Sequence, residues 1–148
     1  MPVYRERLWP TPWAFIATAL VIPASLLVFL PISTVAGVVC AILLYAACIT
    51  ALVIGSPRVD VVDGEFRAGR ARLPLSAVGE VTAYRKDGAT AARGPGLDAR
   101  AWLLIRGWID PVVRVDLDDP SDPTPYWLIS TRRPEELVAA LSSQRAAA

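Results

Sequence analysis

The strongest constraint on this chain is a run of about fifty residues, from Leu8 to Pro57, that contains no charged side chain. Only Arg5, Glu6 and Arg7 come before this run, and every other charged residue lies at or after Arg58. A long uncharged and apolar run is typical of membrane-spanning segments. We therefore predict an integral membrane protein.

The run divides into two apolar stretches, Trp13–Leu30 and Ser33–Ile54, of roughly 18 and 22 residues, which matches the length of membrane helices. The link at 31–33 is so short that the two helices must run antiparallel. We predict an N-terminal segment at 1–12, membrane helices at 13–30 and 33–54, and one domain at 56–148. A cleaved signal peptide is the alternative, but no A-x-A site follows Leu30 and a second apolar run starts at once.

Several residues predict how the helices are built. Pro23 removes a mid-span hydrogen bond and predicts a kink. The second span carries small residues at i, i+4 spacing, for which we prefer packing against the first helix over a dimer face; they are Gly37, Ala41, Ala47, Ala51 and Gly55. Cys40 and Cys48 lie about 12 Å apart on one helix, too far for a disulfide, and we expect free thiols. Neither span holds an ionisable Asp, Glu, Lys or Arg, which argues against a channel or transporter.

The segment after the membrane changes to the two-residue period of β-strands. Residues 58–62 and 65–73 flank the turn Asp63-Gly64 and predict a β-hairpin, with a bulge near Gly69. Further strands are predicted at 79–85, 101–109, 112–117 and 126–131, and an amphipathic helix at 134–145. This order favours a bent antiparallel sheet or barrel capped by a C-terminal helix.

The order of elements and the stretch at 73–81 resemble the bacterial pleckstrin-homology-like domains. A second resemblance covers nearly the whole chain and lies in Tyr4-Arg5-Glu6-Arg7-Leu8, the Trp-bearing strand before Asp110, and the Pro-rich stretch 119–134. These residues are similar to a family of uncharacterised actinobacterial membrane proteins. The resemblance implies two membrane helices and a cytoplasmic β domain, and it implies no activity or ligand.

Two groups of arginines are candidate contacts for anions or lipid headgroups. Arg67, Arg70 and Arg72 lie on a hairpin that a short linker holds near the bilayer, where anionic headgroups attract basic residues. The alternative is an ordinary solvated flank. Arg132 and Arg133 precede the last helix and predict an anion site, although Glu135 and Glu136 follow and can pair with them.

Other features favour structural roles. The acidic residues Asp118, Asp119 and Asp122 are interpreted as a Pro-rich corner in preference to a Ca²⁺ or Mg²⁺ site. Residues 86–100 are expected to form a mobile loop, because their glycines match no phosphate-binding motif. The aromatics Trp102, Trp108, Tyr126 and Trp127 are expected in the core in preference to a binding groove.

The chain contains no His, which excludes Ser-His-Asp, Cys-His and His-metal chemistry. We predict no enzyme activity, no catalytic residue, no cofactor and no metal site. The domain at 56–148 is also electrically even, since it holds 13 Lys and Arg (15 in the chain minus Arg5 and Arg7) and 13 Asp and Glu (14 minus Glu6), which gives no reason to expect nucleic acid.

The charges flanking the spans predict the orientation. Arg5 and Arg7 precede the first span, and Arg58, Arg67, Arg70 and Arg72 follow the second, so the positive-inside rule places both termini in the cytoplasm. The expected function is a non-catalytic, membrane-tethered binding or scaffold module at the plasma membrane, in contact with the bilayer and with anionic lipid or a protein partner. The alternative is an accessory subunit of a larger membrane complex.

Overall fold

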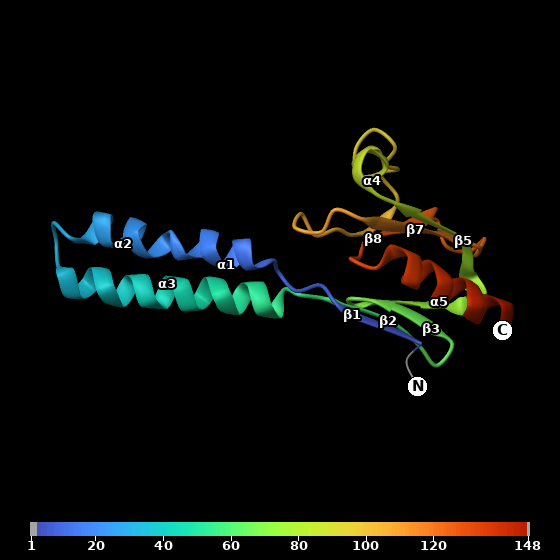
Figure 1. Ribbon diagram of the computed structural model, residues 1–148, viewed down its shortest axis with the longest axis horizontal. Coiled ribbons are helices and arrows are strands. Elements are labelled where there is room, and N and C mark those ends of the chain that lie inside the picture. Colours follow the sequence, from blue (N-terminus) through green and yellow to red (C-terminus); the bar gives the residue numbers. More distant parts are fainter. Residues whose placement is uncertain (1–2, 148) are drawn as a thin grey trace. The chain divides into compact units, whose positions relative to one another are not determined.

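The computed structural model describes residues 3–147, so the boundaries predicted at residues 1 and 148 lie outside the described residues. The chain forms two compact units. Trp9–Ser56 make up the helical unit, and residues 3–8 together with 57–147 make up the β unit (Figure 1).

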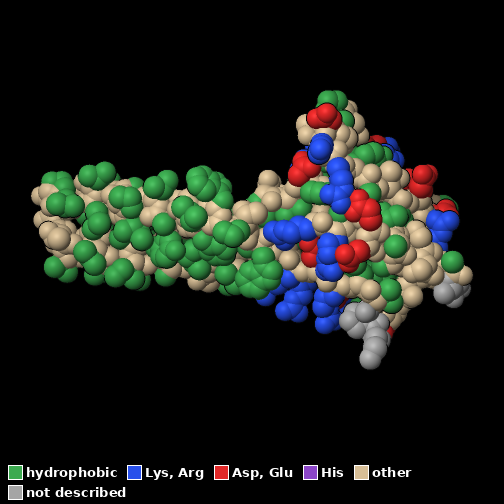
Figure 2. All heavy atoms as spheres, in the orientation of Figure 1, with side chains coloured by type: hydrophobic (Ala, Val, Ile, Leu, Met, Phe, Trp, Pro, Cys, Tyr) green, Lys and Arg blue, Asp and Glu red, His purple; other side chains and the backbone are tan. Residues whose placement is uncertain are grey.

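The helical unit is an antiparallel pair of apolar arms. The first arm consists of α1 (Pro12–Ala19) and α2 (Val21–Phe29), and the second is α3 (Thr34–Ile54). Ser33 starts α3, since its side-chain oxygen accepts the Ala36 N–H at 3.3 Å. The arms span 18 and 21 residues and are long and apolar enough to cross a membrane. Figure 2 shows their surface covered with hydrophobic side chains.

Pro23 affects the first arm as predicted. It has no N–H to donate to the Ala19 carbonyl, and the helix is interrupted at Leu20, between α1 and α2. The Leu20 N–H bonds only three residues back, to the Ala17 carbonyl at 3.2 Å. The interruption therefore lies about one turn before the proline.

Only the first part of the small-residue pattern packs the two arms together. Gly37 and Ala41 are buried, and a Cβ placed on Gly37 would lie 3.2 Å from the Phe29 Cβ. Ala47 and Ala51 are exposed. The close approach of the arms therefore occurs in the half of α3 that faces α2.

Sheet A of the β unit contains four short strands in the order β1-β2-β3-β4. They are β1 (Tyr4–Arg7), β2 (Arg58–Val62), β3 (Glu65–Ala68) and β4 (Ala71–Pro74), all antiparallel. Asp63 and Gly64 both have positive φ, 51° and 77°, as the predicted two-residue hairpin turn requires.

Two sequence predictions about sheet A are wrong. The segment 1–12 was expected to be separate from the β domain, yet its residues Tyr4–Arg7 form strand β1 of sheet A. The expected bulge near Gly69 is a second tight turn, since β3 ends at Ala68 and β4 begins at Ala71. Gly69 has φ 62°, which accounts for the glycine in this turn.

Sheet B has the order β5-β7-β8-β6 and mixes directions. Its strands are β5 (Val78–Tyr84), β6 (Trp102–Leu104), β7 (Val112–Leu117) and β8 (Tyr126–Ser130). β6 pairs with β8 in parallel, so the expectation of a purely antiparallel sheet is wrong. β6 is also shorter than the predicted 101–109, because the chain leaves the strand after Leu104 and the Arg106 N–H bonds the Ser130 hydroxyl at 3.0 Å. The 3-10 helix η1 (Leu75–Ala77) joins β4 to β5.

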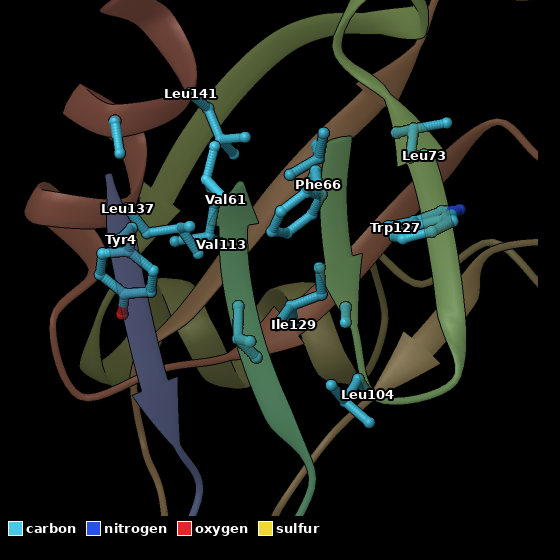
Figure 3. Packing of buried hydrophobic residues seen from close by; sticks show 14 of the residues in the cluster. Tyr4, Val61, Phe66, Leu73, Leu104, Val113, Trp127, Ile129, Leu137 and Leu141 are labelled. Carbon is cyan, nitrogen blue, oxygen red and sulfur yellow. The ribbon is translucent and has the colours of Figure 1, made fainter. Parts of the chain in front are cut away.

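The core lies between the two sheets and the C-terminal helix α5 (Pro134–Ala147). Phe66 of sheet A and Trp127 of sheet B meet with ring centroids 5.9 Å apart, and Leu137 and Leu141 of α5 are fully buried (Figure 3). Over residues 3–147 the strands pair as two separate sheets and no closed barrel forms. The predicted aromatic core is present: the partly buried Trp102 packs against Trp127 with ring centroids 4.6 Å apart and an interplanar angle of 38°.

Candidate functional site

The outer face of sheet A carries a concentration of arginines. Buried residues alternate with exposed or half-buried ones along its strands, so one side of each strand faces the core and the other faces solvent. We define the basic face as the arginines of this outer side and of the 69–70 turn, namely Arg5, Arg7, Arg58, Arg67, Arg70 and Arg72. Only Asp60 and Glu65 add negative charge to the same side of the strands. Figure 2 shows Lys and Arg side chains gathered on the β unit.

The strand register places these arginines in two rows. Arg7 is opposite Arg58, and in the second row Arg67 is opposite Arg72. Like charges directly opposite each other on neighbouring strands repel. Arg67 is partly compensated, because its Nη2 lies 2.9 Å from Glu65 Oε2. Asp60 lies opposite both Arg5 and Arg67 and offsets part of the charge of the second row.

Three of these arginines are uncommitted. Within residues 3–147, Arg58, Arg70 and Arg72 form no ion pair. All three are exposed. Their guanidinium groups are thus free to meet phosphate or carboxylate oxygens, for which a planar guanidinium is well suited.

The basic face lies where the chain passes to the helical unit. The Leu8 N–H donates to the Pro57 carbonyl at 2.9 Å, and the next paired residues are Arg7 and Arg58. The 69–70 turn is at this same end, since the Gly69 N–H donates to the Arg58 carbonyl at 2.7 Å. The opposite end of the sheet carries Asp63 and Glu65. Positive charge is therefore concentrated at the end that leads to α1 and α3.

The second predicted anion site is filled by the chain's own carboxylate. Glu6 points inward from β1 and is only 7% exposed. Its Oε1 accepts the Arg132 N–H at 3.1 Å, and its Oε2 accepts the hydroxyls of Thr131 at 2.5 Å and Tyr4 at 2.7 Å. We call Tyr4, Glu6 and Thr131 the Glu6 cluster. It fastens β1 to the junction of β8 and α5.

Arg132 and Arg133 also serve this junction. Arg132 Nη1 lies 3.9 Å from Glu6 Oε1. Arg133 pairs with Glu136 at 2.9 Å, as predicted, and its Nη2 donates to the Arg5 carbonyl at 2.8 Å. Its guanidinium also lies 5.1 Å from the centre of the Tyr4 ring. These two arginines contact β1 and the start of α5, whereas Arg67, Arg70 and Arg72 belong to the outer side of sheet A.

The Tyr4 hydroxyl of the Glu6 cluster is held in its protonated form. Burial raises the pKa of the Tyr4 hydroxyl far above its ordinary value, and the Glu6 carboxylate acts in the same direction against the opposing Thr131 hydrogen bond. The phenol therefore stays neutral and serves as a hydrogen-bond donor. A satisfied buried network of this kind fixes one arrangement of the strands.

The outer face of sheet B is covered. The segment 86–100, expected to be a mobile loop, contains helix α4 (Lys86–Arg93), so that prediction is wrong. Ala89 of α4 packs with Val112, Tyr126 and Leu128 in a second apolar cluster. The Asp98 N–H donates to the Tyr126 hydroxyl at 2.7 Å and fastens the segment after α4.

Asp110 holds the start of α4. Its Oδ2 accepts the Lys86 N–H at 2.9 Å, and its Oδ1 accepts from Arg93 at 3.0 Å. These contacts hold the pKa of the Asp110 carboxyl below its usual value, with the Lys86 N–H as the main cause. The carboxylate therefore acts as a cap supplied by a distant part of the chain.

The acidic Pro-rich stretch forms turns. Asp119 Oδ1 accepts the Ser121 N–H at 2.9 Å, and Asp122 Oδ1 accepts the Thr124 N–H at 2.8 Å. In an Asx turn the N–H of residue i+2 donates to the side chain of Asp i, so both bonds agree with the predicted corner. Among residues 3–147, no group of three or more acidic or Cys side chains is arranged to hold a metal ion.

Comparison with known proteins assigns the chain to a family and to nothing narrower. A family model described as "Protein of unknown function (DUF3093)" matches residues 3–141. No curated protein and no solved structure matches the chain.

Proposed function

The chain belongs to the DUF3093 family of proteins of unknown function, and from its own residues we propose that it is a non-catalytic membrane-tethered module. In this proposal the helical unit spans the plasma membrane twice with both termini in the cytoplasm. The β unit, of pleckstrin-homology-like type, then presents its basic face to anionic lipid headgroups. The uncovered basic face of sheet A is the observation on which the proposal depends.

The exposure of the helical unit supports membrane insertion. Large apolar side chains point outward along both arms, with Leu27 76% and Ile42 61% exposed. A core helix of a soluble protein would bury such side chains, whereas lipid accepts them. The two packed sheets with α5 against the core support the pleckstrin-homology-like classification.

The length of the linkers supports headgroup contact. Three residues separate the end of α3 at Ile54 from the start of β2 at Arg58. Three residues extend at most about 10 Å, so an inserted α3 keeps Arg58 close to the membrane surface. Each basic residue near an anionic surface contributes about 1 kcal/mol, an attraction that falls off within a Debye length.

The test is lipid selectivity of the full chain. The protein is reconstituted into vesicles of phosphatidylcholine with 30% phosphatidylglycerol, extracted in mild detergent, and its retained lipids are quantified by mass spectrometry. We expect phosphatidylglycerol to be enriched over its bulk fraction, and the Arg67→Ser/Arg70→Ser/Arg72→Ser variant to lose most of this enrichment. At about 1 kcal/mol per arginine the upper limit of the loss is roughly a hundredfold at low salt.

The matched control removes three arginines that lie outside the basic face. Arg85→Ser/Arg100→Ser/Arg145→Ser changes the net charge equally, and these side chains bond Glu135, Asp98 and the Gly79 carbonyl. This variant should retain phosphatidylglycerol like the wild type. Wild-type protein that retains lipids in bulk proportion would refute the lipid contact.

Orientation and partner class need their own measurements. A fluorescent protein fused after residue 148 should be active and a periplasm-dependent phosphatase inactive, and the reverse pattern would refute the proposed topology. Crosslinking with mass spectrometry in native membranes separates the module from the accessory-subunit alternative. A dominant partner captured through Trp9–Ser56 would favour the subunit.

A further inference from the structure

The β unit contains a cavity between helix α4 and the outer face of sheet B. Its volume is about 260 Å³. Figure 1 shows α4 on the side of β7 and β8 that faces away from α5. The cavity is lined from the sheet by Tyr84, Arg114, Tyr126 and Leu128 and from the α4 segment by Gly88, Ala91, Ala92 and Gly96. Any role of this cavity is independent of the lipid contact proposed for sheet A.

The cavity exists because α4 presents small side chains to the sheet. Ala91 and Ala92 carry only a methyl group, and Gly88 carries no side chain. A Cβ placed on Gly88 would lie 3.5 Å from the Tyr84 Cδ1, which is an ordinary contact, and Gly88 is not among the glycines with positive φ. Neither space nor backbone conformation requires a glycine here, although glycine is less favourable than alanine in a helix. Gly88 therefore serves to keep the cavity open.

Arg114 is the only charged residue that lines the cavity among residues 3–147. It lies opposite Leu128, and its guanidinium carbon is 4.0 Å from the centre of the Tyr126 ring. Its Nε donates to Asp116 Oδ1 at 2.7 Å. Within the described residues its two Nη nitrogens form no hydrogen bond. The Tyr126 ring and the Asp116 carboxylate thus hold the guanidinium in place, and its two Nη groups are available to a ligand.

The donors and the walls of the cavity indicate the class of ligand. A guanidinium only donates hydrogen bonds, and its paired N–H groups match the two oxygens of a carboxylate. Asp116 already offsets part of the Arg114 charge, which favours a ligand with one negative charge over a phosphate dianion. Tyr84, Tyr126 and Leu128 provide apolar surface for the body of the ligand.

The volume limits the size of that body. A cavity of 260 Å³ holds about nine groups of the size of a water molecule, at about 30 Å³ each. We infer that the cavity binds a small monocarboxylate with a flat apolar body, whose carboxylate accepts hydrogen bonds from the two Nη groups of Arg114.

Fluorine NMR of the full chain in phosphatidylcholine nanodiscs tests the site, with empty nanodiscs as the blank. The probes are para-fluorobenzoate and its uncharged isostere para-fluorobenzamide. Since hydrogen bonds between charged groups contribute about tenfold or more, we expect the benzoate to bind at least fivefold more tightly than the benzamide. Unlabelled benzoate should displace the probe, and inorganic phosphate at the same concentration should not. Equal binding of the two probes, displacement by phosphate, or no benzoate binding above the blank would overturn the inference.

Two variants test whether the benzoate lies in the cavity. Arg114→Gln removes the charged donors and should weaken fluorobenzoate binding at least tenfold. Ala92→Leu keeps Arg114 and its contacts but fills the cavity, and it should weaken binding of both probes at least tenfold. Amide hydrogen exchange in residues 86–93 checks that α4 stays in place. If Arg114→Gln loosens α4, Ala92→Leu decides the question.

Arg145→Gln is the matched control for the loss of one positive charge. The Arg145 guanidinium donates to the Gly79 carbonyl and does not line the cavity, so this variant should bind fluorobenzoate within twofold of the wild type. A loss as large as that of Arg114→Gln would assign the binding to general surface charge. That result, or an unchanged affinity of Ala92→Leu, would overturn the inference.

Discussion

The outer faces of the two sheets of the β unit differ in chemical character. Sheet B carries Val112, Tyr126 and Leu128 outward, and Ala89 of α4 covers them. Sheet A carries arginines at the corresponding outer positions, with Arg67 and Arg72 side by side across its last hairpin. Within the described part of the β unit, neither helix packs on those arginines, because α4 belongs to sheet B and α5 to the core.

The difference separates residues that stabilise the fold from residues that are available for binding. Apolar side chains on an outer face need a cover, and sheet B receives one from its own chain. Clustered arginines on an outer face repel each other and gain from an external anion. Stability should therefore depend on the outer face of sheet B, and lipid selectivity on the outer face of sheet A.

The largest effect is expected from the covered face. Leu128 is fully buried, so Leu128→Ala removes apolar contacts and leaves a cavity between β8 and α4. We expect a loss of about 2 to 4 kcal/mol in the free energy of unfolding of the β unit, measured by chemical denaturation in detergent. Leu103 is paired with Leu128 in register but is 42% exposed, so Leu103→Ala should cost less than about 1 kcal/mol. Equal losses for the two variants would contradict a packed cover over β8.

The next effect concerns the edge of sheet A. β1 is an edge strand of sheet A, and the Glu6 cluster on its inner side fastens it to the junction of β8 and α5. Glu6→Gln replaces a carboxylate that accepts three hydrogen bonds by an amide whose NH2 group can only donate. We expect the free energy of unfolding to fall by about 1 to 3 kcal/mol, measured by thermal denaturation. Glu136→Gln removes an exposed partner of Arg133 and should cost no more than about 0.5 kcal/mol. An unchanged melting temperature for Glu6→Gln would show that β1 is held by its backbone pairing alone.

The elements predicted well from sequence are those set by local pattern. The two apolar arms, the Asp63-Gly64 turn and the alternation of Val113 and Val115 follow from neighbouring residues. The same holds for Arg67, Arg70 and Arg72, which share one hairpin. Half of the basic face could therefore be identified before the structure was known.

The missed elements depend on contacts between distant residues. β1 has four residues, three of them charged, and pairs with a strand more than fifty positions away. Its inward position Glu6 is polar, so the alternation of Tyr4 and Glu6 resembles no apolar face. Because β1 was missed, Arg5 and Arg7 were assigned only to the membrane flank and not to the outer face of sheet A. α4 contains Gly88 and few large apolar residues, and it is held by Asp110 from another loop, which no local pattern reveals.

The cover of sheet B should loosen in acid. The pKa of Asp110 is depressed in the folded protein, so its contribution is fully present above the ordinary carboxyl pKa near 4 and is lost as the pH falls through the lower folded value. Asp110→Asn should raise amide hydrogen exchange in residues 86–93 several-fold at pH 6, and the difference from wild type should shrink as the pH falls below the ordinary carboxyl pKa. Asp63→Asn, in the remote β2–β3 turn, should leave exchange in α4 unchanged. If the exchange difference between wild type and Asp110→Asn stays the same in acid, the Asp110 side chain stabilises α4 by packing and not by its charge.

The smallest effect on stability is expected on the basic face itself. Arg72 is exposed and lies directly opposite Arg67, so Arg72→Thr removes a like-charge repulsion and keeps a good strand former. In neutral detergent we expect the free energy of unfolding to stay within about 0.5 kcal/mol of the wild type, with any change toward higher stability. In vesicles with phosphatidylglycerol the order should reverse, because only the wild-type arginine gains a phosphate partner, and added salt should remove that gain. A large destabilisation by Arg72→Thr in neutral detergent would mean that the outer face of sheet A supports the fold, and the division of roles between the two sheets would be wrong.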